Sequence, residues 1–246
     1  MIQLNTAQGA SQRKHVVDHQ EAPARGQVVA MHSRYPTFLT LLMLSLVQSI
    51  LAQPGPDVSR EELVATLRSG NIDQIVIELN EIKRMGYKGD ILPFVAELWA
   101  GKPNEGEDET LPWESIGRDI VRIEFADILA QAHRNGLLAE LDEDVAEFAR
   151  ELIGSDDVQL VGRAAQVLGV IDHPRDASLL FELAAREERG TFRPTVLGLA
   201  SMCNEEADAA LSRLQERSLS ERNRDFLMET RASMTAFKDR SDYCDR

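Results

Sequence analysis

The sequence predicts an all-α fold, a short α-solenoid of antiparallel helix pairs. Alanine and leucine together supply 55 of the 246 residues, and aromatic residues make up only 5%. This composition favours helices over a β-sandwich or barrel, which would use more β-branched and aromatic residues. Signals that start and stop helices recur at close spacing, and a helix-pair pattern returns after a shift of 31 residues. Such a recurrence is typical of solenoids.

Residues 31–52 resemble a secretory signal peptide. A short basic lead, Met31–Arg34, precedes the apolar run Phe38–Val47. Gln48-Ser49-Ile50-Leu51-Ala52 follows and ends on a small residue. The apolar stretch is shorter than the ~20 residues of a membrane-spanning helix. We therefore expect cleavage after Ala52, a mature chain that starts at Gln53 with no stable membrane insertion, and a periplasmic or secreted protein. An uncleaved N-terminal anchor and a buried core helix stay open as alternatives.

Residues 1–30 show no apolar period and precede the signal-like segment. A signal peptide normally begins near the start methionine, so we interpret 1–30 as a misassigned or disordered extension, with translation starting at Met31. The helical-repeat domain is expected over 53–246. This part carries 39 acidic and 23 basic residues, a net charge of −16.

Five helices are expected before residue 155, each placed by its cap residues. They cover 59–70, 71–86, 90–101, 112–136 and 142–154. Ser59 and Glu62 form a capping box, Asn71 and Asp142 are N-cap residues, and glycines stand at the helix ends. The stretch 101–111 is expected to be a loop. Its acidic residues suit either a solvated surface or a weak cation or partner site, and Trp99 and Trp113 are expected to anchor its two ends in the core.

The clearest repeat spans 156–217. A helix from Val158 to Gly169 is followed by a second one that begins at His173–Pro174, where His173 is interpreted as a turn residue. Adding 31 to each number gives the later copy, whose second helix is capped by Asn204, and a last helix starts at Ser220. The repeated inward positions are Leu168 with Leu199, Ile171 with Met202, Leu180 with Leu211, and Leu183 with Leu214.

The stretch VQLVGRAAQVLGVIDHPRDASLLFELA resembles a HEAT-like repeat of the short bacterial kind, which forms armadillo-like superhelices. The matching residues are Arg163, Ala164 or Ala165, Val167, Leu168, Gly169, Ala177, Leu180, and Leu183 or Ala184. The second copy departs from the pattern, because Pro194 stands in place of Arg163 and Gly198 in place of Val167. The resemblance covers about 60 residues and implies a protein-binding surface on the concave side. It identifies an architecture and not a particular function.

The residue content argues against several chemistries. The strong negative charge disfavours sequence-independent binding to nucleic acid, which needs a clustered cationic surface. After residue 52 the chain has two histidines and two cysteines, without the spacing of a metal site. Phosphate-binding glycine motifs and nucleophile elbows do not occur. The sequence therefore predicts no catalytic residue, metal or cofactor.

Two sets of residues remain as candidate sites. Arg186, Arg213 and Arg217 are expected on one exposed face of the repeated second helices, where arginine suits carboxylates of a protein partner. Ordinary solvated surface is the alternative. Cys203 and Cys244 would be joined as a disulfide in an oxidising compartment if the last helix packs along the second repeat, or they would be two unrelated thiols.

These observations favour an exported, non-enzymatic protein-protein interaction module or scaffold, whose partner the sequence does not identify. An enzyme, or a subunit that assists one as the HEAT-like lyases do, is the alternative class. A membrane-anchored form of the same scaffold also stays open.

Overall fold

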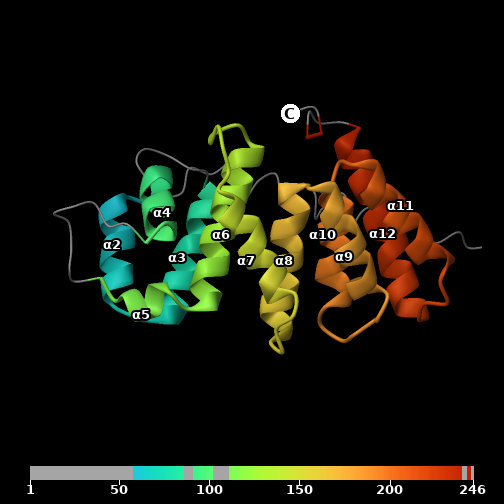
Figure 1. The fold of residues 1–246 in the computed structure, drawn as a ribbon, viewed down its shortest axis with the longest axis horizontal. Coiled ribbons are helices and arrows are strands. Elements are labelled where there is room, and N and C mark those ends of the chain that lie inside the picture. The colour runs from blue at the N-terminus through green and yellow to red at the C-terminus, as the bar shows by residue number, and fades with distance from the viewer. Residues whose placement is uncertain (1–57, 86–90, 102–110, 240–242, 245–246) are drawn as a thin grey trace, which may run out of the picture. The chain divides into compact units, whose positions relative to one another are not determined.

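Helices form all the regular structure in the part of the chain that the computed structural model describes, which is 58–85, 91–101, 111–239 and 243–244. The all-α expectation is confirmed for these residues, and Figure 1 shows the helices with their labels. Their bounds are α2 Arg60–Arg68, α3 Ile72–Met85, α4 Ile91–Trp99, α5 Trp113–Ile116, α6 Asp119–Arg134, α7 Glu143–Leu152, α8 Val158–Ile171, α9 Pro174–Ala184, α10 Phe192–Ser201, α11 Glu205–Glu216 and α12 Glu221–Lys238.

Side chains cap several helices at the residues that the sequence indicates. Ser59 and Glu62 form the reciprocal capping box of α2. The Asp142 carboxylate accepts a hydrogen bond from the backbone of α7, and Asn204 Oδ1 accepts one from the Ala207 backbone in α11 at 2.9 Å. His173 Nδ1 accepts the backbone N–H of Arg175 at 3.2 Å, so this histidine is the N-cap of α9. These bonds satisfy backbone groups that have no partner within a helix.

Two of the expected helix bounds are wrong. The expected helix over 112–136 is two helices, because α5 ends at Ile116 and Arg118 is extended (φ −68°, ψ 139°) before α6 begins. Gly117 lies at the break, where its low helix propensity makes the interruption inexpensive. By contrast, α8 continues past Gly169 to Ile171 and stops at Asp172, which adopts a left-handed conformation (φ 64°). Gly169 is therefore inside the helix and has a packing role.

The helices contact one another in a regular succession. Helix α6 packs on α3 and α8, and α10 packs on α8 and α12, while α9 packs on α10 and α11 (Figure 1). All these helices belong to one compact unit within Gln48–Arg246. The leucines expected to point inward are buried: Leu168, Leu180 and Leu199 are 0% exposed and Leu211 is 2% exposed. The prediction that these four leucines are buried is therefore confirmed.

Helices α8 and α10 approach closely because glycines face the neighbouring backbone. A Cβ built at Gly169 would lie 2.6 Å from the Cα of Gly198, and one built at Gly198 would lie 3.0 Å from the carbonyl carbon of Ala165. A Cβ at Gly162 would lie 2.9 Å from Cγ of Pro194. Pro194 and Gly198, the two residues at which the sequence departs from the expected repeat pattern, both belong to this contact.

A buried ionic cluster joins α3, α6 and α8. The ammonium of Lys83 on α3 contacts the carboxylate of Glu124 and lies 2.8 Å from that of Asp127, both on α6. The guanidinium of Arg163 on α8 lies 3.2 Å from the other Glu124 oxygen. The Glu124 and Lys83 side chains are 1% and 9% exposed. Removing one partner would leave a buried charge uncompensated, which makes this cluster a strong constraint on how the three helices meet.

Candidate functional site

A network of polar contacts links the ends of α6, α8, α10 and α12. Arg134 at the end of α6 donates a hydrogen bond to the Val170 carbonyl at 2.9 Å and lies 3.6 Å from the Asp172 carboxylate. Asp172 Oδ1 in turn accepts hydrogen bonds from the Cys203 backbone at 2.8 Å and from the Asn204 amide at 2.7 Å. Asp172 follows α8 and Cys203 follows α10, so the turns after these two helices are bound to each other. We call these contacts the helix-end network.

The C-terminal segment after α12 joins this network. Lys238, the last residue of α12, donates a hydrogen bond to the Met202 carbonyl. The structure brings Cys203 and Cys244 together as a disulfide, with Cα atoms 5.5 Å apart. A terminal nitrogen of Arg134 lies 2.8 Å from Sγ of Cys203. The guanidinium also lies over the Tyr243 ring, 4.2 Å from its centre, a favourable cation–π geometry.

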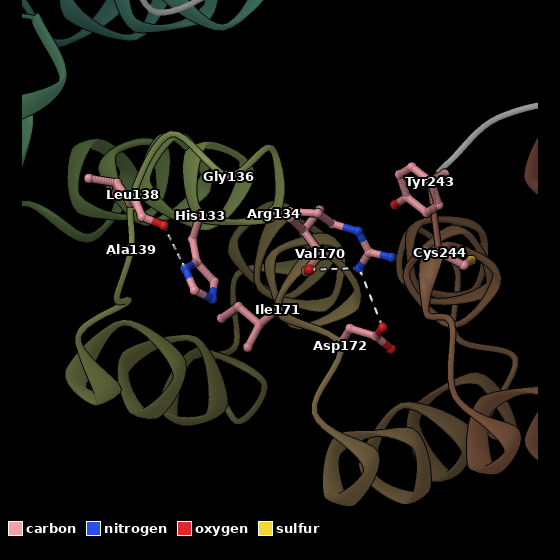
Figure 2. A pocket seen from close by; sticks show the side chains of 10 residues that line it. All are labelled: His133, Arg134, Gly136, Leu138, Ala139, Val170, Ile171, Asp172, Tyr243 and Cys244. Carbon is pink, nitrogen blue, oxygen red and sulfur yellow. Dashed lines mark hydrogen bonds and ion pairs between the residues drawn. The ribbon is translucent and has the colours of Figure 1, made fainter. Parts of the chain in front are cut away.

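A cavity of about 430 Å³ lies beside these contacts (Figure 2). Figure 2 shows Arg134 reaching between Val170 and Tyr243, with Asp172 below it and His133 directed toward Leu138. The lining residues are His133, Arg134, Gly136, Leu138, Ala139, Val170, Ile171, Asp172, Tyr243 and Cys244. A carbonyl oxygen can only accept, so His133 Nδ1 donates its proton to the Leu138 carbonyl at 3.1 Å. The cavity therefore combines one fixed cation, one carboxylate and an aromatic wall.

Burial changes the pKa values of two groups near the cavity. It raises the pKa of the Tyr243 phenol, against the opposing effect of the Arg134 charge. It lowers the pKa of Lys238, against the carboxylates of Asp208 and Asp172, which favour the charged ammonium. Both shifts have the direction expected when a charged form loses solvation. The side chains of Lys238 and Tyr243 are therefore partly withdrawn from solvent.

The structure places the three predicted arginines at exposed positions. Arg213 lies within α11, with its guanidinium 3.9 Å from the centre of the Phe181 ring. Arg217 is the C-cap of α11, and Arg186 follows the C-cap of α9, so neither lies within its expected helix. The Arg217 charge contributes to lowering the pKa of Glu187. Arg213 and Arg217 thus already interact with groups of this chain.

The Glu187 carboxylate connects the turn after α9 to the start of α12. It accepts hydrogen bonds from the Ser220 backbone at 3.0 Å, the Ser220 hydroxyl at 3.0 Å and the Asn223 amide at 2.8 Å. The hydrogen bond from the Ser220 backbone is the largest cause of its lowered pKa. Glu187 has φ 51°, an unusual backbone conformation for a residue with a side chain. The three hydrogen bonds hold this turn in place.

A groove of about 560 Å³ runs between α10 and α12. Its apolar lining includes Leu197, Phe226 and Met234, and charged side chains of both signs stand around it: Arg193, Arg222, Asp225 and Glu229. Leu197 is 39% exposed, although it is a large apolar residue. The Arg193 guanidinium lies 4.8 Å from the centre of the Phe226 ring. The groove therefore offers apolar contact area bordered by groups that can form directional polar contacts.

Several sequence predictions concern residues outside the described ranges. These are the extension 1–30, the signal-like segment 31–52 and the acidic stretch Glu105–Glu109. Trp99 is 5% exposed and packs edge-to-face on Phe148, as expected for a core residue. The side chain of Trp113 is outside the described part of the chain.

Sequence reasoning missed Arg134 and Asp172, the central residues of the helix-end network. A basic residue in the last turn of α6 is favoured by the helix dipole, which was the available signal for Arg134. Nothing in the sequence indicated that its partners would be Val170 and Cys203, 36 and 69 residues away.

Within the described residues, no group of three or more histidine, cysteine, aspartate or glutamate side chains is arranged to hold a metal ion. A search of the same residues finds no helix both long and apolar enough to span a membrane. Compared with models of known families, with curated proteins and with solved structures, the chain matches none.

Proposed function

We propose that this protein is an exported, non-enzymatic scaffold that binds another protein, with the architecture of a short HEAT-like α-solenoid. The 31-residue spacing supports the architecture, because the leucines at equivalent positions are buried and the equivalent residues Asp172 and Cys203 are hydrogen-bonded. The signal-like pattern of residues 31–52 supports export.

The groove between α10 and α12 is the observation that carries the binding function. A large exposed apolar side chain beside half-buried apolar ones is the usual composition of a protein-docking surface, with polar groups at its rim. Leu197 is the exposed anchor, and Phe226 and Met234 are partly buried in the groove. We propose that a segment of a partner protein places an apolar side chain against Leu197 and pairs its own charges with the rim. Arg186, Arg213 and Arg217 would contact acidic residues of the same partner.

Site-specific photocrosslinking tests this proposal in the envelope fraction of the native host. A photoreactive residue at 197 is expected to trap one discrete protein, and the same residue at 77 is the matched control. Ile77 on α3 is also a large apolar residue, 61% exposed, and lies outside the groove. Leu197→Glu should abolish capture through a crosslinker placed at Met234. Equal crosslinking from 77 and 197, or none from 197, would contradict the proposed docking site.

The intact mass of protein purified from its native host tests export separately. The mass should correspond to a chain that starts near Gln53. A cytosolic protein that retains residues 1–30 would show that the export part of the proposal is wrong.

A further inference from the structure

The two sulfurs of the disulfide have different surroundings. Cys203 is half-buried in the turn after α10, where its backbone N–H is bound by Asp172 and its Sγ lies 2.8 Å from an Arg134 nitrogen. Cys244 is exposed, on the segment that follows α12. A thiolate from solution therefore reaches Cys244 more easily than Cys203. The Cys203 sulfur is the one in contact with the positive charge of Arg134.

This difference decides which way the bond breaks most easily. In thiol–disulfide exchange, the rate rises when the departing sulfur is stable as a thiolate. A neighbouring arginine lowers the pKa of a cysteine thiol by favouring the thiolate, and the guanidinium itself stays charged at all accessible pH values. Contact with Arg134 thus makes Cys203 the better leaving group.

We propose that the Cys203–Cys244 disulfide is a site of thiol–disulfide exchange with an external thiol, attacked at Cys244. The incoming thiolate forms a bond to Cys244 Sγ, and the Cys203 sulfur departs with the electron pair of the broken bond as a thiolate held by Arg134. The product is a mixed disulfide at Cys244. A second external thiol then attacks that mixed disulfide, which oxidises the two external thiols to a disulfide and leaves Cys203 and Cys244 reduced.

Other charged groups around Cys203 partly cancel one another. Lys238 packs on the same turn through the Met202 carbonyl, and Asp172 and Asp208 face Lys238. The Asp172 carboxylate opposes a thiolate at Cys203, but it already accepts hydrogen bonds from the Cys203 backbone and Asn204. Arg134 is the charge in direct contact with the sulfur, and charge interactions weaken with distance. The contact with Arg134, which favours a thiolate at Cys203, therefore outweighs the opposing effect of the Asp172 carboxylate.

The position of a trapped adduct tests the direction of attack on the unmodified, oxidised full chain. The protein is incubated briefly with reduced glutathione, free thiols are blocked with N-ethylmaleimide, and peptides are mapped by mass spectrometry. Glutathione is expected on Cys244 and the maleimide on Cys203. Glutathione mainly on Cys203, or equally on both, would overturn the proposal. This experiment needs no variant, so a failure to fold does not affect it.

The role of Arg134 is tested in a Cys244→Ser chain by the pH dependence of alkylation at Cys203. The pKa of Cys203 is expected to lie at least about one unit below the ordinary value of about 8.5. Adding Arg134→Met should raise it toward that value, and Arg134→Lys should keep most of the decrease. The exposed Arg189, changed to Met, is the matched control. Circular dichroism verifies folding of each variant. An unchanged pKa in folded Arg134→Met would refute the role of the guanidinium.

Discussion

Replacing Gly169 by alanine should destabilise the protein, although alanine is the better helix former. Within an isolated helix this change would be favourable by about 1 kcal/mol. In the structure, the added Cβ would lie 2.6 Å from the Cα of Gly198 and 2.6 Å from the Ser201 hydroxyl, and closer still to the Gly198 carbonyl oxygen. Two of these three atoms belong to the backbone of α10, so a change of side-chain rotamer cannot relieve the overlap. The two helices must move apart by about 1 Å to reach an ordinary contact, a gap that forfeits a quarter to a half of each van der Waals attraction across it.

The magnitude follows from these opposing effects. Overpacking a core typically costs about 1–3 kcal/mol, and a backbone overlap belongs at the upper end of that range. Subtracting the helix-propensity gain leaves a net loss of about 2 kcal/mol in the free energy of unfolding. Urea denaturation followed by circular dichroism measures it. Gly154→Ala is the matched control, because its Cβ would meet nothing closer than the Glu151 carbonyl oxygen at 3.5 Å. A Gly169→Ala protein as stable as the wild type, or more stable, would refute the close helix contact.

Three further predictions concern the core, the buried charges and pH. Leu180→Ala should lower the free energy of unfolding by about 2–5 kcal/mol because Leu180 is fully buried. Leu197→Ala, at an exposed position, should change the free energy of unfolding little. Equal effects of the two substitutions in urea denaturation would contradict the burial of Leu180. Lys83→Met should cost about 3–5 kcal/mol, because it leaves the buried Asp127 carboxylate without its cation and leaves Glu124 with Arg163 alone. The neighbouring exposed Arg84→Met loses only a surface ion pair and should cost less than about 1 kcal/mol. Folding lowers the pKa of Glu187. The stabilising contribution of the Glu187 carboxylate should therefore be complete above the unfolded pKa of about 4.3 and be lost as the pH falls through the folded pKa. The stability difference between wild type and Glu187→Gln should be present at pH 7 and vanish in acid, and a difference independent of pH would contradict the role of the carboxylate.

Local patterns determined much of the helical structure. Capping side chains such as Ser59, Asp142 and Asn204 act on backbone groups within three residues, so their roles can be recognised from neighbouring sequence. The apolar spacing that placed Leu168 and Leu180 in the core is also a local property of a helix with one buried face. The 31-residue recurrence is a comparison of two such local patterns along the chain, so it too is visible in the sequence.

The features that only the tertiary structure decided are contacts between residues far apart in the chain. Gly169 resembles a helix end in the sequence, but the backbone of α10 across from it makes it a packing residue inside α8. Arg134 resembles any basic residue near a helix C-terminus, and its partner Cys203 is 69 positions away. The geometry of the pair Cys203 and Cys244 likewise depends on where α12 packs. Such contacts require the relative placement of whole helices, which local propensity and periodicity do not encode because each describes a single helix and its nearest neighbours along the chain.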